Sequence, residues 1–205
     1  PCAENDINLQ NSYGDTPLHT AIVEGYIDIV QLLIDTGADI NLQNNQGDTP
    51  LHDAVREGKL VDIIQLLLDA GAYVNLQDDE GETALTIACE KRNEEIVKLL
   101  LNHDANVNLQ NKNGDTALHI ACINKMVDIV EALINYFPKD KELEKIKYIN
   151  TKNNYGKTAL QIACETDNNS PSDTINNQII TLLLYNRADL TNNCSKKIEN
   201  LQALI

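Results

Sequence analysis

The stretch NLQNNQGDTPLHDA, residues 41–54, almost repeats NLQNSYGDTPLHTA, which lies 33 residues earlier at 8–21. Related stretches follow at 75–88, 108–121 and 150–163. The threonine shared by the five copies falls at positions 16, 49, 83, 116 and 158, so successive copies are 33, 34, 33 and 42 residues apart. A nearly fixed period of this length indicates one supersecondary unit that is stacked on itself.

The first complete unit, 11–43, predicts two helices. Thr16 is placed to cap a helix whose first residue is Pro17, where the missing N–H of proline is not needed. A second apolar stretch at 27–35 forms the next helix, and Gly37 closes that helix in the left-handed conformation. Each unit is therefore predicted to consist of a helix, a turn, a helix and a protruding hairpin loop.

This pattern resembles the ankyrin repeat. The residues that carry the resemblance are Gly-Asp-Thr-Pro-Leu-His-x-Ala, at 14–21 and 47–54, and Leu-Leu-Ile-Asp-Thr-Gly-Ala-Asp-Ile-Asn at 32–41. The resemblance implies an all-α fold, a solenoid of helix-turn-helix units with protruding hairpin loops. The chain is predicted to consist of the tail of a truncated preceding repeat at 1–10, repeats at 11–43, 44–77, 78–110, 111–152 and 153–193, and a C-terminal capping helix at 194–205.

The later repeats depart from the glycine pattern of the first two. A non-glycine residue in the left-handed conformation costs about 1–2 kcal/mol, so repeats three to five are expected to be intrinsically weaker. The replacements are Arg92, Lys125 and Asp167, where Gly25 and Gly58 end the first helix, and Asp104 and Arg187, where Gly37 and Gly71 end the second.

Two insertions lengthen the last repeats, one near 136–148 and one near 168–175. Such residues extend loops or helix ends without disturbing the stack. The first insertion carries four lysines beside three acids, the only phenylalanine and two tyrosines. It is either drift in a tolerant loop or a protrusion that contacts a partner.

Composition limits the class of partner. The net charge of −15 argues against nucleic acid and against an anionic membrane surface, because both require a dense lysine and arginine footprint. No signal-peptide pattern opens the chain, and no apolar run approaches the roughly 18 residues of a membrane span. We expect a soluble, monomeric, cytoplasmic protein. Abundant Asn and Ile, which AT-rich codons encode, are consistent with a microbial protein that acts in the cytosol of a host cell.

Three of the five cysteines, Cys89, Cys122 and Cys164, occupy the same position in successive repeats. Equivalent residues on stacked helices lie about 8–10 Å apart, beyond the roughly 7 Å that a disulfide can span. All three are therefore predicted to be reduced core thiols. Cys2 and Cys194 lie at opposite ends of the array and are not expected to meet.

No pattern in the chain predicts catalysis. The resemblance implies that His19, His52 and His119 bridge neighbouring backbone, and one histidine per repeat cannot converge on one metal. The four serines lie in turns or in the second insertion without a base nearby in the sequence, and no phosphate-binding glycine loop is present. Regularly spaced carboxylates are interpreted as a solvated edge. We predict no active site, no cofactor and no metal.

Function is therefore expected on a surface. In a stacked array the hairpin tips and the exposed residues of the first helices line a concave groove. These positions vary between copies while the surrounding residues stay fixed, which is typical of a protein-binding scaffold. The middle of the groove is acidic, which favours a partner protein with a basic or mixed-charge segment. The predicted contact residues are Tyr13, Asp15, Val23, Glu24, Gln46, Asp48, Arg56, Glu57, Asp79, Glu80, Glu82, Lys91, Asn113, Asp115, Ile123, Tyr155 and Lys157.

Two other hypotheses stay open at this point. The array can be the targeting arm of a larger enzyme or secreted effector whose catalytic domain lies outside these residues. Alternatively, Asn41 can be a modification substrate, because the context from Leu33 to Asn41 resembles the hairpin asparagine that is hydroxylated in some ankyrin repeats. The competing interpretation is that Asn41 is an ordinary turn residue.

Overall fold

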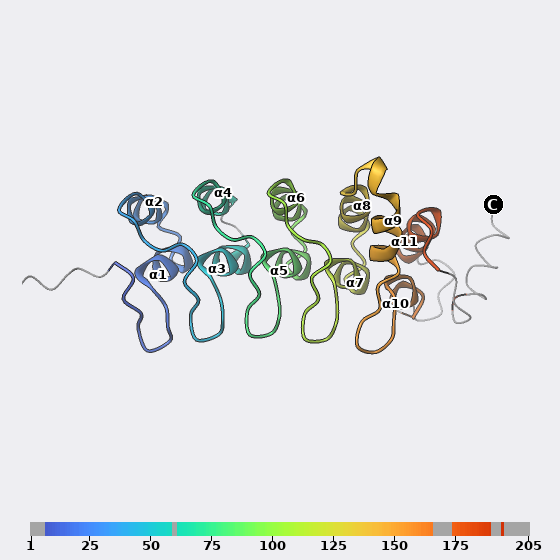
Figure 1. Cartoon of the computed structure of the whole chain (residues 1–205), viewed down its shortest axis with the longest axis horizontal. Helices are drawn as coiled ribbons and strands as arrows, with labels where there is room; N and C mark the ends of the chain where they lie inside the picture. Colours follow the sequence, from blue (N-terminus) through green and yellow to red (C-terminus); the bar gives the residue numbers. More distant parts are fainter. Residues whose placement is uncertain (1–6, 59–60, 166–173, 190–193, 195–205) are drawn as a thin grey trace, which may run out of the picture. The chain divides into compact units, whose positions relative to one another are not determined.

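The computed structural model describes residues 7–58, 61–165, 174–189 and 194 of the 205-residue chain. These residues form helices joined by turns and loops, and they contain no β-strand, so the all-α prediction is confirmed (Figure 1). The chain divides into two compact units, Pro1–Asn106 and Val107–Ile205.

Unit 1 is built from three helix pairs. In Figure 1 the first helices of the pairs lie side by side in one row, the second helices form another row, and the hairpin loops extend away from the first row. The middle first helix contacts both of its neighbours. The pairs are α1 (Pro17–Val23) with α2 (Ile27–Asp35), α3 (Pro50–Glu57) with α4 (Val61–Asp69), and α5 (Ala84–Glu90) with α6 (Glu94–Asn102).

Unit 2 contains two further pairs and one additional helix. First helix packs on first helix, α7 on α10, and second helix packs on second helix, α8 on α11. The elements are α7 (Ala117–Ile123), α8 (Val127–Asn135), the 3-10 turn η1 (Lys139–Lys141), α9 (Glu142–Ile149), α10 (Ala159–Glu165) and α11 (Thr174–Tyr185).

The core of each unit is thin and aliphatic. Every first helix buries the leucine two residues after its capping threonine and the alanine five residues after it, as Leu18 and Ala21 do in α1. The small alanine allows the neighbouring first helix to approach closely. The second helix α2 differs from α4, because α2 buries only Val30 whereas α4 buries four apolar side chains.

The left-handed conformation predicted for the non-glycine replacements is confirmed. Arg92, Asp104, Lys125 and Arg187 have φ angles of 59°, 59°, 56° and 65°. Asp167 lies outside the described residues. The later repeats thus keep the left-handed turn of Gly25 and its equivalents, although they lack glycine, which adopts this conformation most easily.

The insertion at 136–148 forms η1 and most of α9. Its aromatic residues pack on one another, since the ring of Phe137 lies 5.9 Å from that of Tyr136 and 5.3 Å from that of Tyr148. Tyr148 is buried. These aromatic side chains therefore stabilise the added helix. Most of the second insertion, residues 195–205 of the predicted capping helix and residues 1–6 of the predicted tail lie outside the described residues.

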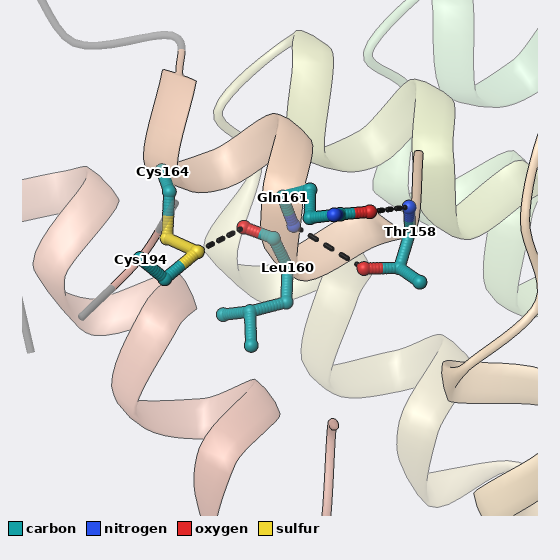
Figure 2. Close-up of a disulfide and its surroundings, with 5 residues drawn as sticks. All are labelled: Thr158, Leu160, Gln161, Cys164 and Cys194. Carbon is teal, nitrogen blue, oxygen red and sulfur yellow. Dashed lines mark hydrogen bonds between the residues drawn. A yellow bond between two sulfur atoms is a disulfide. The ribbon is translucent and has the colours of Figure 1, made fainter. Parts of the chain in front are cut away.

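One cysteine prediction is wrong. Cys89 and Cys122 are free and buried, as expected, and burial raises the pKa of both thiols. Cys164, however, forms a disulfide with Cys194 (Figure 2). The spacing of about 8–10 Å applies to equivalent cysteines on stacked helices, and Cys194 is not equivalent to Cys164. Residue 194 returns to α10, where the two Cα atoms lie 5.7 Å apart, within reach of a disulfide.

Candidate functional site

Each first helix begins at a capping box, which fixes where the neighbouring surface residues lie. The backbone N–H of Thr16 donates to Nδ1 of His19 at 3.2 Å. In the last pair the backbone N–H of Thr158 donates to Oε1 of Gln161 at 2.8 Å (Figure 2). The side chain of the third helical residue thus satisfies a backbone donor at the helix start. The equivalent pairs are Thr49 with His52, Thr83 with Thr86 and Thr116 with His119.

The three histidines bridge repeats, as the family resemblance implies. Nε2 of His19 lies 3.1 Å from the backbone oxygen of Asp48. A carbonyl oxygen only accepts, so Nε2 carries the proton and Nδ1 accepts from the threonine cap. Burial lowers the pKa of each ring and keeps it neutral. The described residues contain no group of side chains that could hold a metal ion. The other bridges, also at 3.1 Å, join His52 to Leu76 O and His119 to Lys157 O.

The recurring Asn-Leu-Gln segment joins successive repeats within each unit, a role that was not predicted from the sequence. Oδ1 of Asn41 accepts the backbone N–H of Tyr73 at 2.7 Å, so this asparagine has a structural role in the turn. Nε2 of Gln43 donates to the backbone oxygen of Gln77 at 3.0 Å. Equivalent bonds run from Asp39 N to Asn8 Oδ1, from Asn106 N to Asn75 Oδ1, from Asp189 N to Asn150 Oδ1, from Gln10 to Gln43 O, and from Gln110 to Lys152 O.

The hairpin tips are held by their backbone and present their side chains to solvent. In unit 1 the backbone N–H of Asn45 donates to Tyr13 O at 3.0 Å. In unit 2 the backbone N–H of Asn154 donates to Asn113 O, also at 3.0 Å. The residue before the hairpin glycine is exposed in all five copies. These residues are Tyr13, Gln46, Glu80, Asn113 and Tyr155.

The remaining predicted contact residues differ in exposure. Asp48 and Asp115 were interpreted as part of a solvated edge, and that interpretation is wrong because both are buried. Asp115 accepts a hydrogen bond from Asn153 Nδ2 at 2.8 Å. The exposed residues are Val23, Glu24, Glu57, Asp79, Lys91 and Ile123, and the half-buried ones are Asp15, Arg56, Glu82 and Lys157.

Arg56 joins three carboxylates of unit 1. Its guanidinium lies 3.0 Å from Asp48, 2.6 Å from Asp78 and 3.7 Å from Glu82. Burial, and then a hydrogen bond with Glu90, raises the pKa of Glu82 to about 7. This cluster holds successive hairpins together, and the sequence argument missed Asp78. In unit 2 Lys157 pairs with Glu165.

Unit 1 also contains a pocket of about 410 Å³ between the first two hairpins and their helices. Asp53 of α3, which the sequence argument overlooked, is one of its lining residues. Burial, then the nearby charges of Asp48 and Asp15, raise the pKa of Asp53 to about 7. Aligning the five repeats would have singled out Asp53, because the equivalent position is an isoleucine in repeats three to five.

Comparison with known proteins agrees with this architecture. A family model described as ankyrin repeats (three copies) matches residues 2–78 and 59–145. A search of curated proteins finds no match to the chain. No helix in the described part of the chain is long and apolar enough to cross a membrane. Ankyrin repeats generally act as protein-interaction modules and are typically non-catalytic. The matched segments together extend over residues 2–145, and the chain belongs to the ankyrin-repeat family.

Proposed function

We propose that this chain is a non-catalytic module that binds a partner protein through the hairpin tips and first helices of its repeats. One observation carries the proposal. The residue before the hairpin glycine is exposed in every copy and is of four different types in the five copies, as Tyr13, Gln46 and Glu80 illustrate in unit 1. The residues around it, which bond successive repeats together, recur. Variation at exposed positions, on a backbone that recurring residues hold in place, is what a specific binding surface requires.

The chemistry of the tips fits a protein partner. Tyr13 and Tyr155 are exposed aromatic side chains, and exposed aromatics often concentrate the binding energy of interfaces. Val23 and Ile123 add exposed aliphatic groups on the first helices. The net charge of −15 favours a basic or mixed-charge segment and disfavours nucleic acid. The module works as a monomer in the cytoplasm, whether its own or that of a host.

The test is a pulldown that compares two matched variants with the parent chain. The surface variant carries Tyr13→Ala, Val23→Ala, Glu80→Lys and Tyr155→Ala. The control variant changes the same residue classes at exposed positions away from the tips, with Tyr73→Ala, Ile29→Ala, Asp28→Lys and Tyr185→Ala. Circular dichroism establishes that all three chains are folded.

We expect the parent and the control variant to retain the same protein and the surface variant to lose it. A protein retained equally by all three would show that the tips do not bind it, and attention would move to the added helix α9. Capture of no protein by any of the three would contradict the proposed function.

A further inference from the structure

Acidic side chains are prominent in the lining of the pocket in unit 1. About 410 Å³ of space is lined by the carboxylates of Asp15, Glu24, Asp48 and Asp53. Among the described residues, His19 is the only histidine that lines it, and burial lowers the pKa of His19 and keeps the ring neutral. No lysine or arginine within the described ranges lines the pocket. A cavity of this size is in the range that proteins use for ligands.

The pocket exists because two residues depart from the repeat pattern. The position four residues after the capping threonine is a buried isoleucine in three repeats, at Ile87, Ile120 and Ile162. The same position is Thr20 in α1 and Asp53 in α3, and both line the pocket. Thr20 is smaller than isoleucine, and Asp53 replaces a hydrocarbon wall with a carboxylate. These two substitutions therefore leave space at this position and place a carboxylate beside it.

Two of the four carboxylates have no partner of their own among the described residues. Asp15 accepts a hydrogen bond from Asn44 at 3.0 Å, and Asp48 is paired with Arg56 at 3.0 Å. Neither Glu24 nor Asp53 makes a side-chain hydrogen bond or ion pair within the described part of the chain. Asp53 is also partly buried, so its charge lacks full hydration, and it has no ion pair of its own within the described residues.

We propose that this pocket binds one cationic side chain of the partner protein, arginine better than lysine. The inference rests on the proposed function and names one feature of the partner. Charge complementarity selects a cation, and an organic one, because no group of metal-ligating side chains occurs within the described residues. Carboxylates from α3 and from the hairpins match the several donors of a guanidinium better than the single ammonium of lysine.

The mouth of the pocket favours arginine for a second reason. Tyr13 and Val23, which also line it, are exposed. The methylene groups of an arginine side chain can cover the isopropyl group of Val23, and its planar head can stack on the ring of Tyr13.

The test is a titration of the isotope-labelled 205-residue chain, followed by the shifts of its backbone amide signals in NMR spectra. The probes are N-acetyl-arginine amide, N-acetyl-lysine amide and the neutral isostere N-acetyl-citrulline amide. We expect the arginine probe to shift amides at 13–24 and 44–53, with a dissociation constant of about 1–10 mM. The lysine probe binds more weakly, and the citrulline probe leaves these amides unchanged.

Three variants define the site. Asp53→Ile restores the residue that repeats three to five carry and is expected to abolish the response to arginine. Asp53→Asn preserves the shape of the side chain and is expected to weaken binding at least threefold, which keeps the test valid if the isoleucine variant is unstable. Asp28→Asn removes an exposed charge on α2 and is expected to change nothing.

The proposal is overturned if citrulline shifts the same amides as arginine, if arginine shifts acidic residues throughout the chain, or if both Asp53 variants respond like the parent. The pulldown distinguishes this failure from failure of the proposed function. A partner that the parent and Asp53→Asn bind equally would contradict the pocket alone. A chain that binds the arginine probe but captures no protein would contradict the proposed function.

Discussion

The hairpin glycine and the residue before it have opposite roles. Gly14 has a φ of +79°, and a Cβ atom at this position would lie 2.6 Å from the backbone nitrogen of Asn45. Tyr13, its neighbour, contributes its backbone oxygen to the same contact and leaves its ring in solvent. The contact between hairpins thus requires glycine at one position, whereas the exposed residue before it is free to vary.

Asp53 makes the stability of the chain depend on pH. Its pKa is raised from 3.8 to about 7, by burial and by the charges of Asp48 and Asp15, while Arg56 opposes the shift and Glu57 adds to it. The folded chain therefore holds the proton more tightly than the unfolded chain does. Stability falls as pH rises from about 4 to about 7, because the folded state must then ionise a partly buried carboxyl group.

Asp53→Asn should remove the part of this pH dependence that Asp53 causes, while the part that Glu82 causes remains. At pH 5 we expect the variant to be only slightly more stable than the parent, whereas at pH 8 its gain in the free energy of unfolding should be larger by about 1–2 kcal/mol. Urea denaturation at both pH values measures the difference, with Asp28→Asn as the control. An equal effect of Asp53→Asn at pH 5 and pH 8 would rule out this account of Asp53.

At the scale of elements, the contact between successive hairpins explains the repeated glycine. Gly114 and Gly156 occupy the same turn position with φ angles of +74° and +73°. A Cβ atom on Gly114 would lie 2.5 Å from the backbone nitrogen of Asn154, whereas a Cβ atom on Gly156 meets no described atom within 4 Å. Alanine variants of these two glycines therefore separate the cost of backbone strain from the cost of disturbing the contact between hairpins.

We expect Gly156→Ala to lower the free energy of unfolding by about 1 kcal/mol, the strain of alanine in the left-handed region. Gly114→Ala should lower it by about 3 kcal/mol or more, because the backbone of the next hairpin must also move. Urea denaturation of both variants measures the difference. If the two losses were equal, hairpin packing would not be the reason for the glycine at 114.

The disulfide ties residue 194 to α10, and alkylation can detect it. Without reductant, N-ethylmaleimide should label Cys89 and Cys122 only after the chain is unfolded, because both thiols are buried. Cys164 and Cys194 should be labelled only after reduction. Peptide mass mapping of chain purified in air measures all four. Labelling of Cys164 in unfolded, unreduced chain would mean that the disulfide does not form.

The Cys194→Ser variant tests what the disulfide contributes. The bond joins residues 30 apart, so chain-entropy arguments predict a stabilisation of about 3–4 kcal/mol. We expect the variant to lose up to this amount, measured by urea denaturation against Cys89→Ala as a control that keeps the disulfide. A Cys194→Ser variant as stable as the parent under oxidising conditions would show that the bond adds nothing.

At the scale of the whole molecule, the repeat period predicted the fold well. The 33-residue spacing, the capping threonines and the left-handed positions are all local signals, and Thr16, Gly37 and Arg92 lie where those signals indicate. Helix 27–35 was predicted to its end residues. Each of these features depends on a few neighbouring residues, so one sequence is enough to read them.

Features that depend on distant residues were harder to predict. The pairing of Cys164 with Cys194 depends on the path of the chain after α11. Asp48 is buried because it pairs with Arg56 and lies where its hairpin contacts the neighbouring one. Asp53 lines a pocket together with Thr20 of another helix. None of these arrangements leaves a local pattern, although comparison between repeats points to Asp53.

The central claim, that the hairpin tips bind a partner protein, is tested most directly by photo-crosslinking from four exposed tyrosines. Tyr13 and Tyr155 lie at tips and are 66% and 71% exposed, while Tyr73 and Tyr185 lie elsewhere and are 65% and 86% exposed. Each is replaced in turn by p-benzoylphenylalanine and irradiated in cell lysate. Binding through the tips predicts that one protein is crosslinked from position 13, position 155 or both, and from neither control. The same protein crosslinked from 73 or 185 and from neither tip would contradict it.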